Sequence, residues 1–491
     1  MLLSIRKFFF ENTSLKQTIF KNTFWLFFAE IISHFLRLIL IIFIARVLGA
    51  EEYGKFTFAL SFVSLLAILS DLGISSLITR EFSKQKENEK EYADIISLKM
   101  FLSISVAIIT FILSFFIGVE ESIQKTIWVL IAFIFVDGFF SIFYPFVRAR
   151  LKMEYEAITK IAQVLITVLL GIIFISIFPS AINLSYAYLV ASVVVLTIVA
   201  VFFHFFLYFL KISFNFSVWK KLLKNSWPLI FGFIGTWTYI NLDSVMIGFW
   251  SSPEEVGWYN ASARIIFAVI IIFAGIISRS FYPLLSKFSK KAEAGLQKIF
   301  NYYLGLMIAL SLPMMIGGIV LADKIVDFLY GFQKYEPSVM IFQILIILAS
   351  ASFLYYPYGT MLVVCDGQKK NFFVIAFGIL INFILNLILV PIYGFYGAAV
   401  STVISSIVSL ILIILFSKYY TPISPFNFES FKILTASFIS SIVMFFFIIN
   451  PVIYKFNLIL SCLMGCAVYF LFFLLIMAGI NKLVYVKNKK N

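Results

Sequence analysis

The stretch Gly49-Ala50-Glu51-Glu52-Tyr53-Gly54 separates two apolar runs, residues 24–45 and 56–78, and a copy of it recurs later in the chain. The copy, Ser252-Pro253-Glu254-Glu255-Val256-Gly257, follows a third apolar run at 227–249. We expect each stretch to form a short turn between two membrane helices. The glycine at its end permits a positive φ or a close backbone approach, and the carboxylates favour the N-terminus of the following helix.

The two copies belong to a longer internal repeat. The same offset, 224 − 21 = 203 and 254 − 51 = 203, relates five pairs of identical residues: Lys21/Lys224, Asn22/Asn225, Glu51/Glu254, Glu52/Glu255 and Gly54/Gly257. Matches at one offset before and after the same apolar run indicate a duplicated six-helix unit. An even number of helices per unit makes both copies run in the same direction, and transporters commonly bind substrate between such halves.

Composition places the chain in a membrane. It is 62% hydrophobic and 13% charged, about half the charge of an ordinary soluble domain. Apolar runs of roughly 20 residues, the length of a membrane-spanning helix, recur about fourteen times. We predict an all-α polytopic membrane protein with about 14 transmembrane helices. Its predicted segments are an N-terminal six-helix lobe at 1–210, a second six-helix lobe at 211–418, and two appended helices with a basic tail at 419–491.

The distribution of positive charge predicts the orientation. Lys and Arg total 38; two lie inside predicted helices, Arg37 and Arg264. Six lie in one set of alternate gaps: Arg46, Lys55, Lys125, Lys324, Lys334 and Lys455. The remaining 30 (38 − 2 − 6) lie in the other gaps and the two tails, so the positive-inside rule puts both termini in the cytoplasm. We expect a multi-pass protein of the cell (inner or plasma) membrane. The net charge of +14 then reflects topology and anionic lipid headgroups, not nucleic acid.

Ionisable and amide side chains inside the predicted helices are the candidate functional residues, because such groups usually face a bundle interior or a water-filled cavity. Glu30, His34 and Arg37 form one stripe on the first helix, since they are spaced by four and three. The candidates for substrate binding are Arg37, Arg264, Asn241, Asn382 and Asn386. The candidates for ion coupling or for a polar cavity lining are Glu30, His34, Asp71, Asp137 and Asp243.

The roles of these residues have competing interpretations. Arg37 and Arg264, one from each half, could face a central cavity and bind an anionic group, because the planar guanidinium bonds diphosphate oxygens in pairs. Alternatively, Asp243 and Arg264 form a structural ion pair. Glu30 could likewise neutralise Arg37, while Asp71 and Asp137 could bond neighbouring backbone.

Three motifs resemble one family. Ala45-Arg46-Val47-Leu48-Gly49-Ala50-Glu51-Glu52-Tyr53-Gly54, Asp71-Leu72-Gly73-Ile74 and Pro391-Ile392-Tyr393-Gly394-Phe395-Tyr396-Gly397-Ala398-Ala399 are similar to the polysaccharide-biosynthesis (Wzx-type) flippases of the MOP superfamily. The resemblance covers nearly the whole chain. It implies a V-shaped, MATE-like fold around a central cavity. It also implies translocation of a polyprenyl-diphosphate-linked oligosaccharide, such as an O-antigen repeat unit, from the inner to the outer leaflet by alternating access.

The sequence leaves two other transport functions open. A lipid II flippase of the same superfamily and a MATE-type multidrug or cation antiporter are the alternatives. An enzyme is disfavoured, because the short outward loops carry no His and only turn-like Glu pairs. We expect no cofactor and no metal site. The expected partners are the lipid-linked glycan, membrane lipids, a coupling cation (H⁺ or Na⁺), and polysaccharide polymerase or assembly proteins.

Overall fold

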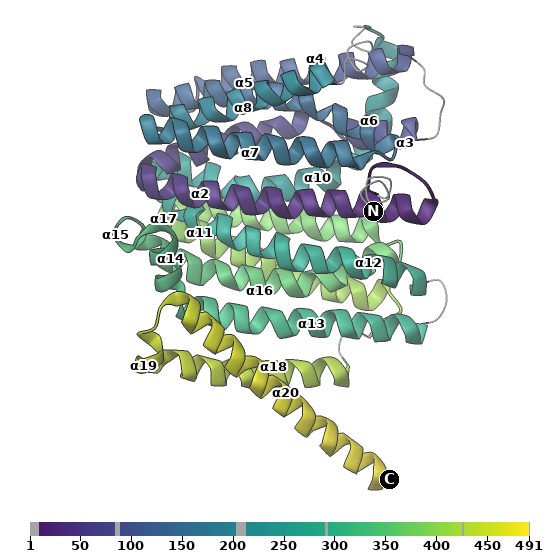
Figure 1. The fold of residues 1–491 in the computed structure, drawn as a ribbon, viewed down its shortest axis with the longest axis vertical. Coiled ribbons are helices and arrows are strands. Elements are labelled where there is room, and N and C mark those ends of the chain that lie inside the picture. Colours follow the sequence, from purple (N-terminus) through teal and green to yellow (C-terminus); the bar gives the residue numbers. More distant parts are fainter. Residues whose placement is uncertain (1–8, 84–88, 203–212, 290–292, 425–426, 491) are drawn as a thin grey trace. The chain divides into compact units, whose positions relative to one another are not determined.

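A computed structural model describes residues 9–83, 89–202, 213–289, 293–424 and 427–490, and this part of the chain is helical, without a strand. Its long helices lie side by side within each of two compact units, Met1–Gly257 and Trp258–Asn491 (Figure 1). Among the described residues, eleven helical stretches are long and apolar enough to cross a membrane. The predicted all-α polytopic membrane fold is therefore confirmed.

The number of crossings agrees with the sequence. Two of the 11 stretches each hold two helices that meet at a kink: α2, Leu15–Ala67, bends at Gly49, and α17, Gln368–Tyr420, bends at Gly394. Counting both arms gives 11 + 2 = 13 crossings. The helix α10, Phe216–Trp250, contains the predicted run at 227–249 and adds a fourteenth.

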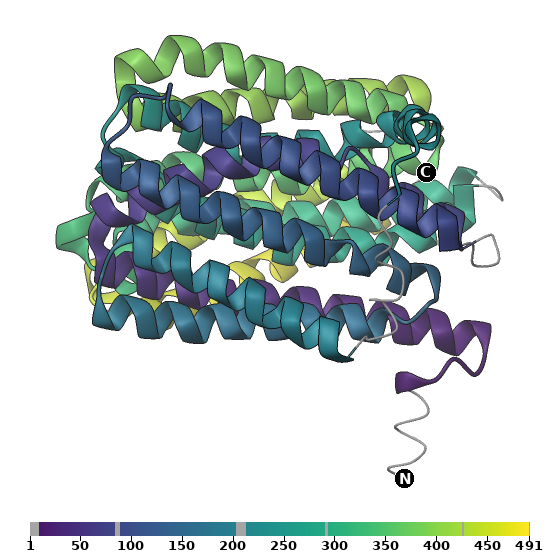
Figure 2. The same cartoon turned by 90° about the horizontal axis from the view of Figure 1, so that it is seen from above.

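The first unit is built from α2, α10 and the helices between them. These are the 3₁₀ turn η1 (Ile68–Ser70), α3 (Ile74–Phe82), α4 (Glu89–Ser114), α5 (Glu121–Ser141), α6 (Phe143–Ala149), α7 (Met153–Ile177) and α8 (Ala181–Phe202). The first arm of α2 packs along α7, and α5 packs between α8 and α4. In Figure 2, seen from above, these long helices run roughly along one direction.

The second unit begins within α11, Pro253–Val269, and contains the other helices. These are the π-helical turn η2 (Ile270–Gly275), α12 (Ile276–Ser289), α13 (Glu293–Val320), α14 (Ala322–Tyr330), α15 (Phe332–Tyr335), α16 (Pro337–Val364), α17, α18 (Phe428–Ile449), α19 (Pro451–Tyr454) and α20 (Leu458–Lys490). The predicted appended helices pack on this unit, because α18 contacts α13 and α20. The Tyr469 hydroxyl donates to the Ala309 carbonyl, 2.8 Å away.

The predicted division into two six-helix lobes, 1–210 and 211–418, and two appended helices, 419–491, stays a prediction. The contacts group α10 with the first unit, where it packs against α2 and α3.

Polar contacts in the first unit connect loops that the distribution of Lys and Arg assigns to the same side of the membrane. At one end, Lys55 Nζ lies 3.3 Å from a Glu120 carboxylate oxygen, and Glu52 accepts a hydrogen bond from the backbone N–H of Ala181. At the other end, Lys21 pairs with Glu154 at 2.9 Å. The capping expected of Glu52 is therefore found, but at the start of α8 instead of the helix that follows it directly.

The repeated turns contact one another through their glycines. A Cβ built on Gly54 would lie 1.7 Å from the carbonyl oxygen of Pro253, and one built on Gly257 would lie 2.0 Å from that of Ala50. Pro253 is the repeat counterpart of Ala50, since 253 − 50 = 203. The contact is therefore reciprocal, and close backbone approach is the reason for both glycines. The positive φ of this region belongs to Gly49, at 78°.

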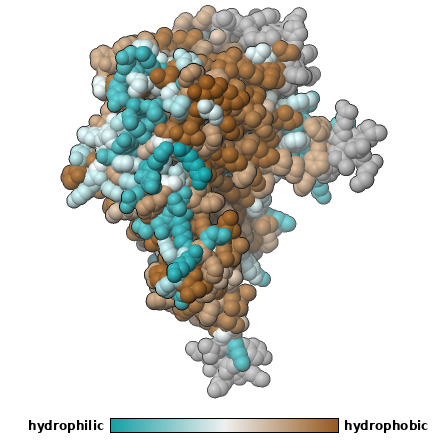
Figure 3. All heavy atoms as spheres, turned by 60° about the vertical axis from the view of Figure 1, so that its left-hand side comes forward, coloured by the Kyte–Doolittle hydropathy of each residue, from teal (hydrophilic) through white to brown (hydrophobic). Residues whose placement is uncertain are grey.

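The surface carries the signature of a membrane protein. Hydrophobic residues cover much of the face drawn in Figure 3, and hydrophilic residues gather in one zone beside them. Large apolar side chains such as Phe116, Val201 and Phe446 are more than two-thirds exposed. Exposed apolar area on this scale is matched to lipid and would not be stable in water.

We expect Gly54→Ala and Gly257→Ala each to destabilise the protein by about 1–3 kcal/mol, the usual cost of overpacking, because backbone atoms must move apart. The control is Gly479→Ala in α20, where an added Cβ meets nothing within 4 Å. Thermal melting of the purified proteins in detergent measures the effect. Melting of the Gly54 and Gly257 variants at the wild-type temperature would contradict the reciprocal contact.

Candidate functional site

The first arm of α2 has three distinct faces. Ala29, Leu40 and Ile44 are each 1% exposed and form the packed face. On the opposite side, Phe28, Phe35 and Ile39 are 42%, 60% and 41% exposed, as expected of side chains in contact with lipid. The predicted polar stripe lies between them. The helix therefore separates its lipid-facing and its charged sides.

The polar stripe is open at the surface of the unit. His34 Nε2 lies 3.4 Å from a Glu30 carboxylate oxygen, and the two side chains are 22% and 36% exposed. Arg37 is exposed as well. Within the described part of the chain Arg37 makes no direct ion pair, so its guanidinium retains its donors. Glu30 is engaged with His34 one turn away, and anion binding by Arg37 stays a prediction.

Asp137 lies at the junction of several helices. Gln163 of α7 donates a hydrogen bond to its carboxylate and another, 3.4 Å long, to the Ser192 hydroxyl of α8. The charges of Arg37 and Lys99 also act on the Asp137 carboxylate. The structure thus brings together two predicted residues, Asp137 and Arg37, with three partners that lie on other helices.

Asp71 lies where the second membrane helix breaks. It ends the turn η1, and the next two residues have positive φ, 42° at Leu72 and 75° at Gly73. Its carboxylate accepts from the Ser75 hydroxyl at 2.5 Å and pairs with the ammonium group of Lys99 on α4, which is 3% exposed. Such breaks within membrane helices recur at transporter binding sites.

A second charged cluster lies at the start of α7, and sequence reasoning missed it. Arg148 donates two hydrogen bonds to the buried Glu156, Nε at 2.7 Å and Nη2 at 2.6 Å. Lys160 lies 2.9 Å from the same carboxylate and 5.3 Å from the centre of the Tyr144 ring. The i,i+4 spacing of Glu156 and Lys160 was the available signal.

The predicted amides of α17 lie in its core. Asn382 and Asn386 are 1% and 0% exposed. Asn382 donates to the Thr402 hydroxyl at 3.1 Å, and Asn386 donates to Asn382 at 3.3 Å. Since Thr402 lies beyond the kink at Gly394, the bond from Asn382 joins the two arms of α17, while the bond from Asn386 lies within the first arm. Substrate binding by these two residues stays a prediction.

The remaining predicted residues lie on α10 and α11. Asn241 and Asp243 are buried, 3% and 1% exposed, beside the fully buried Ser244. Arg264 is half-buried on α11. Asp243 and Arg264 belong to different compact units, and their pairing stays a prediction.

The charged side chains of the first unit are arranged in a way that suits the electrostatic binding of a ligand better than catalysis. Four cations (Arg37, Lys99, Arg148, Lys160) and four carboxylates (Glu30, Asp71, Asp137, Glu156) lie on α2 to α7, mostly in pairs. In the described residues no three His, Cys, Asp or Glu side chains are grouped so that they could hold a metal ion. A partly exposed, balanced set of charges can receive an anionic headgroup or take up a cation.

Comparison with known families gives two overlapping matches. Residues 19–289, which are 289 − 19 + 1 = 271 of the 491, match the family described as polysaccharide biosynthesis protein. Residues 228–388 match the MatE family.

Individual relatives agree with these matches. The probable low-salt glycan biosynthesis flippase Agl15 of Haloferax volcanii is 23% identical over 401 residues, which cover 78% of this chain and 80% of the relative. The solved structure of the lipid II flippase MurJ, in an inward closed conformation, is 16% identical and covers 94% of this chain and 99% of its own, with a TM-score of 0.75. An inward-facing multidrug resistance MATE family transporter gives a TM-score of 0.62 at 14% identity, over 79% and 94% of the two chains. At these identities, the two solved structures show the fold.

We expect Lys99→Met to destabilise the protein by about 1–3 kcal/mol, because it leaves the Asp71 carboxylate in the helix break without its cation. The cost is below that of breaking a fully buried pair, because the Asp71 side chain is 36% exposed. The matched control is Lys125→Met, whose pair with Glu121 is exposed at 52% and 79% and is worth under about 0.5 kcal/mol. Melting temperatures give both values. Asp71→Asn with Lys99→Met should cost less than the sum of the two single variants, and simple additivity would contradict the pair.

Proposed function

This chain belongs to the polysaccharide biosynthesis protein family, and from that premise we propose that it is a flippase for a lipid-linked glycan. Its substrate is a polyprenyl-diphosphate-linked oligosaccharide, such as the repeat unit of an O-antigen or another polysaccharide. The protein moves the glycan headgroup from the inner to the outer leaflet by alternating access. It lies in the cell membrane as a multi-pass protein with both termini in the cytoplasm.

The observation that carries the proposal is the open charged stripe on α2. Arg37 is exposed and Glu30 and His34 are half-buried within an apolar helix of membrane-spanning length, on a different side of it from Phe35 and Ile39. A charge at the bilayer centre costs about 2.5–3.5 kcal/mol even on the lowest scale. A stripe of this kind therefore requires a polar space beside it, and a polar space within a membrane transporter is where a hydrophilic headgroup travels.

The chemistry of each group suits one part of the substrate. The guanidinium groups of Arg37 and Arg264 bind the diphosphate, because their planar forks bond its oxygens in pairs. Asn241, Asn382 and Asn386 offer amides to sugar hydroxyls. The polyprenyl tail needs no polar partner and stays in the hydrocarbon, which is roughly 30 Å thick. The protein thus replaces water around the headgroup alone.

The free energy for transport comes from the membrane potential or from a cation gradient, with H⁺ or Na⁺ as the coupling ion. The carboxylates of Asp71, Asp137 and Asp243 are the groups that could take up the cation. Asp137 is the best placed of them, because its hydrogen bond to Gln163 and the nearby charges of Arg37 link ion binding to the stripe on α2. Polymerase or assembly proteins would use the flipped glycan.

Two other transport functions remain as alternatives. The likeness to the lipid II flippase structure concerns the fold, and a MATE-type exporter shares that fold as well. The family of residues 19–289 and the glycan flippase among the relatives favour the polysaccharide substrate. The relatives are flippases and transporters, which also supports a transport protein in preference to an enzyme.

We expect Arg37→Ala and Arg264→Ala each to slow the transfer of a fluorescent polyprenyl-diphosphate oligosaccharide across reconstituted liposomes. A hydrogen bond to a charged group contributes about 1.5–3 kcal/mol, so binding should weaken by about 10- to 100-fold. Access of the lipid to an impermeant quencher measures the rate. Lys125→Ala, on the exposed outer end of α5, is the control, and unchanged rates for both Arg variants would contradict the diphosphate role.

We expect Asp137→Asn to uncouple transfer from the driving gradient, because the amide cannot take up a proton and has no negative charge to attract Na⁺. Rates are compared in liposomes with and without an imposed H⁺ or Na⁺ gradient. The wild-type protein should respond to one of the two gradients, and the variant to neither. A variant that keeps the full response excludes Asp137 as the coupling group and leaves Asp71 and Asp243.

A further inference from the structure

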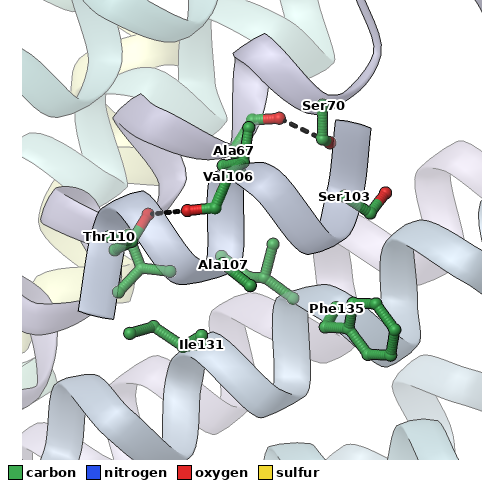
Figure 4. A pocket seen from close by; sticks show the side chains of 10 residues that line it. Ala67, Ser70, Ser103, Val106, Ala107, Thr110, Ile131 and Phe135 are labelled. Carbon is green, nitrogen blue, oxygen red and sulfur yellow. Dashed lines mark hydrogen bonds between the residues drawn. The ribbon is translucent and has the colours of Figure 1, made fainter. Parts of the chain in front are cut away.

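A small cavity lies within the first unit between the end of α2, η1, α4 and α5. Its volume is about 20 Å³, and most of its lining is apolar, including Ala67, Ala107 and Ile131 (Figure 4). Its polar lining consists of the hydroxyl groups of Ser70, Ser103 and Thr110. We call it the Ser103 cavity. One water molecule requires about 10–15 Å³ measured in the same way, so the cavity has room for one.

Ser103 differs from the other hydroxyl residues of α4. Ser105, Thr110 and Ser114 each donate a hydrogen bond to a carbonyl three or four residues earlier. The hydroxyl of Ser103 is buried, with 6% of the residue exposed, and has no protein hydrogen-bond partner. A buried hydroxyl left without any partner costs about 1–3 kcal/mol. The partner of Ser103 is therefore to be sought in the cavity that it lines.

Ser70 is the lining residue that could accept a hydrogen bond from a water molecule bound to Ser103. Its hydroxyl donates to the Ala67 carbonyl at 2.7 Å (Figure 4). It keeps lone pairs that accept, because a hydroxyl has one proton and two acceptor sites. Thr110 lies seven residues beyond Ser103, about 10 Å along the helix, which is too far for the same water. A bare cation is disfavoured, because no ionisable side chain is among the lining residues.

We propose that the Ser103 cavity binds one water molecule, which accepts a hydrogen bond from Ser103 and donates one to Ser70. The water joins α4 to η1 beside the ion pair that joins the same two elements. Ser70 directly precedes Asp71, and Ser103 lies one turn beyond Lys99 on α4. The helix break at Leu72 and Gly73 is thus held by a direct charged contact and by a water bridge. This binding site does not depend on the identity of the transported lipid.

The melting temperatures of Ser103→Ala and Ser70→Ala test the water bridge, because the direction in which the melting temperature changes depends on whether the water is bound. With the water bound, Ser103→Ala removes a satisfied hydrogen bond and lowers the melting temperature. Without it, the substitution removes an unsatisfied buried hydroxyl and raises the melting temperature, which would overturn the proposal. The control is the half-buried Ser105, whose hydroxyl donates to the Phe101 carbonyl of its own helix. Ser105→Ala should lower the melting temperature by less than Ser103→Ala.

The double variant supplies a second readout. Ser70 and Ser103 have no hydrogen bond to each other, so the water is the partner that they share. Their effects should therefore be non-additive, with the double variant losing less than the sum of the single losses. Strict additivity would overturn the bridge. A cryo-EM map that resolves ordered water should show density within hydrogen-bond distance of both hydroxyl oxygens, and an empty cavity in such a map would also refute the proposal.

Discussion

The cost of placing charge in hydrocarbon is the constraint on which the rest of this structure depends. Lys99 and Asp71 meet that cost by pairing. Arg37 is exposed and has no ion pair of this kind in the described residues. A charge that is neither paired nor buried at this depth needs water or an anionic ligand beside it. The proposed passage for a diphosphate headgroup follows from that need.

The duplicated sequence has a direct structural counterpart. The two repeated turns keep the glutamate pair and the final glycine. Each of these glycines, Gly54 and Gly257, faces the backbone of the other copy. The carboxylates of the first turn serve a different purpose from the one that an isolated turn suggests. Glu51 and Glu52 both pair with Lys55, and Glu52 also binds the start of α8. The turn therefore ties together loops that lie far apart in the sequence.

Much of the fold could be predicted, because each membrane helix is visible in its own stretch of sequence as an apolar run with charged ends. The kinks at Gly49 and Gly394 fall within the two turn motifs quoted from the sequence, and the stripe on α2 follows from helical spacing. The partners of the buried charges could not be predicted, because they depend on which helices pack together. Lys99 and Arg148 count as loop cations in the charge pattern, yet they pair with Asp71 and Glu156. The break at Leu72 was hidden inside an apolar run. Contacts with the substrate involve a second molecule, which the chain does not encode.

Water accessibility along α2 tests the central claim most directly. Single cysteines at positions 30, 34, 35, 37 and 39 would be introduced after replacing the natural Cys365, Cys462 and Cys466. Their reaction with a water-soluble maleimide would then be followed in membranes. The account predicts that the cysteines at 30, 34 and 37 react, while those at 35 and 39 are protected by lipid. Protection at 37 together with reaction at 35 would contradict the polar passage.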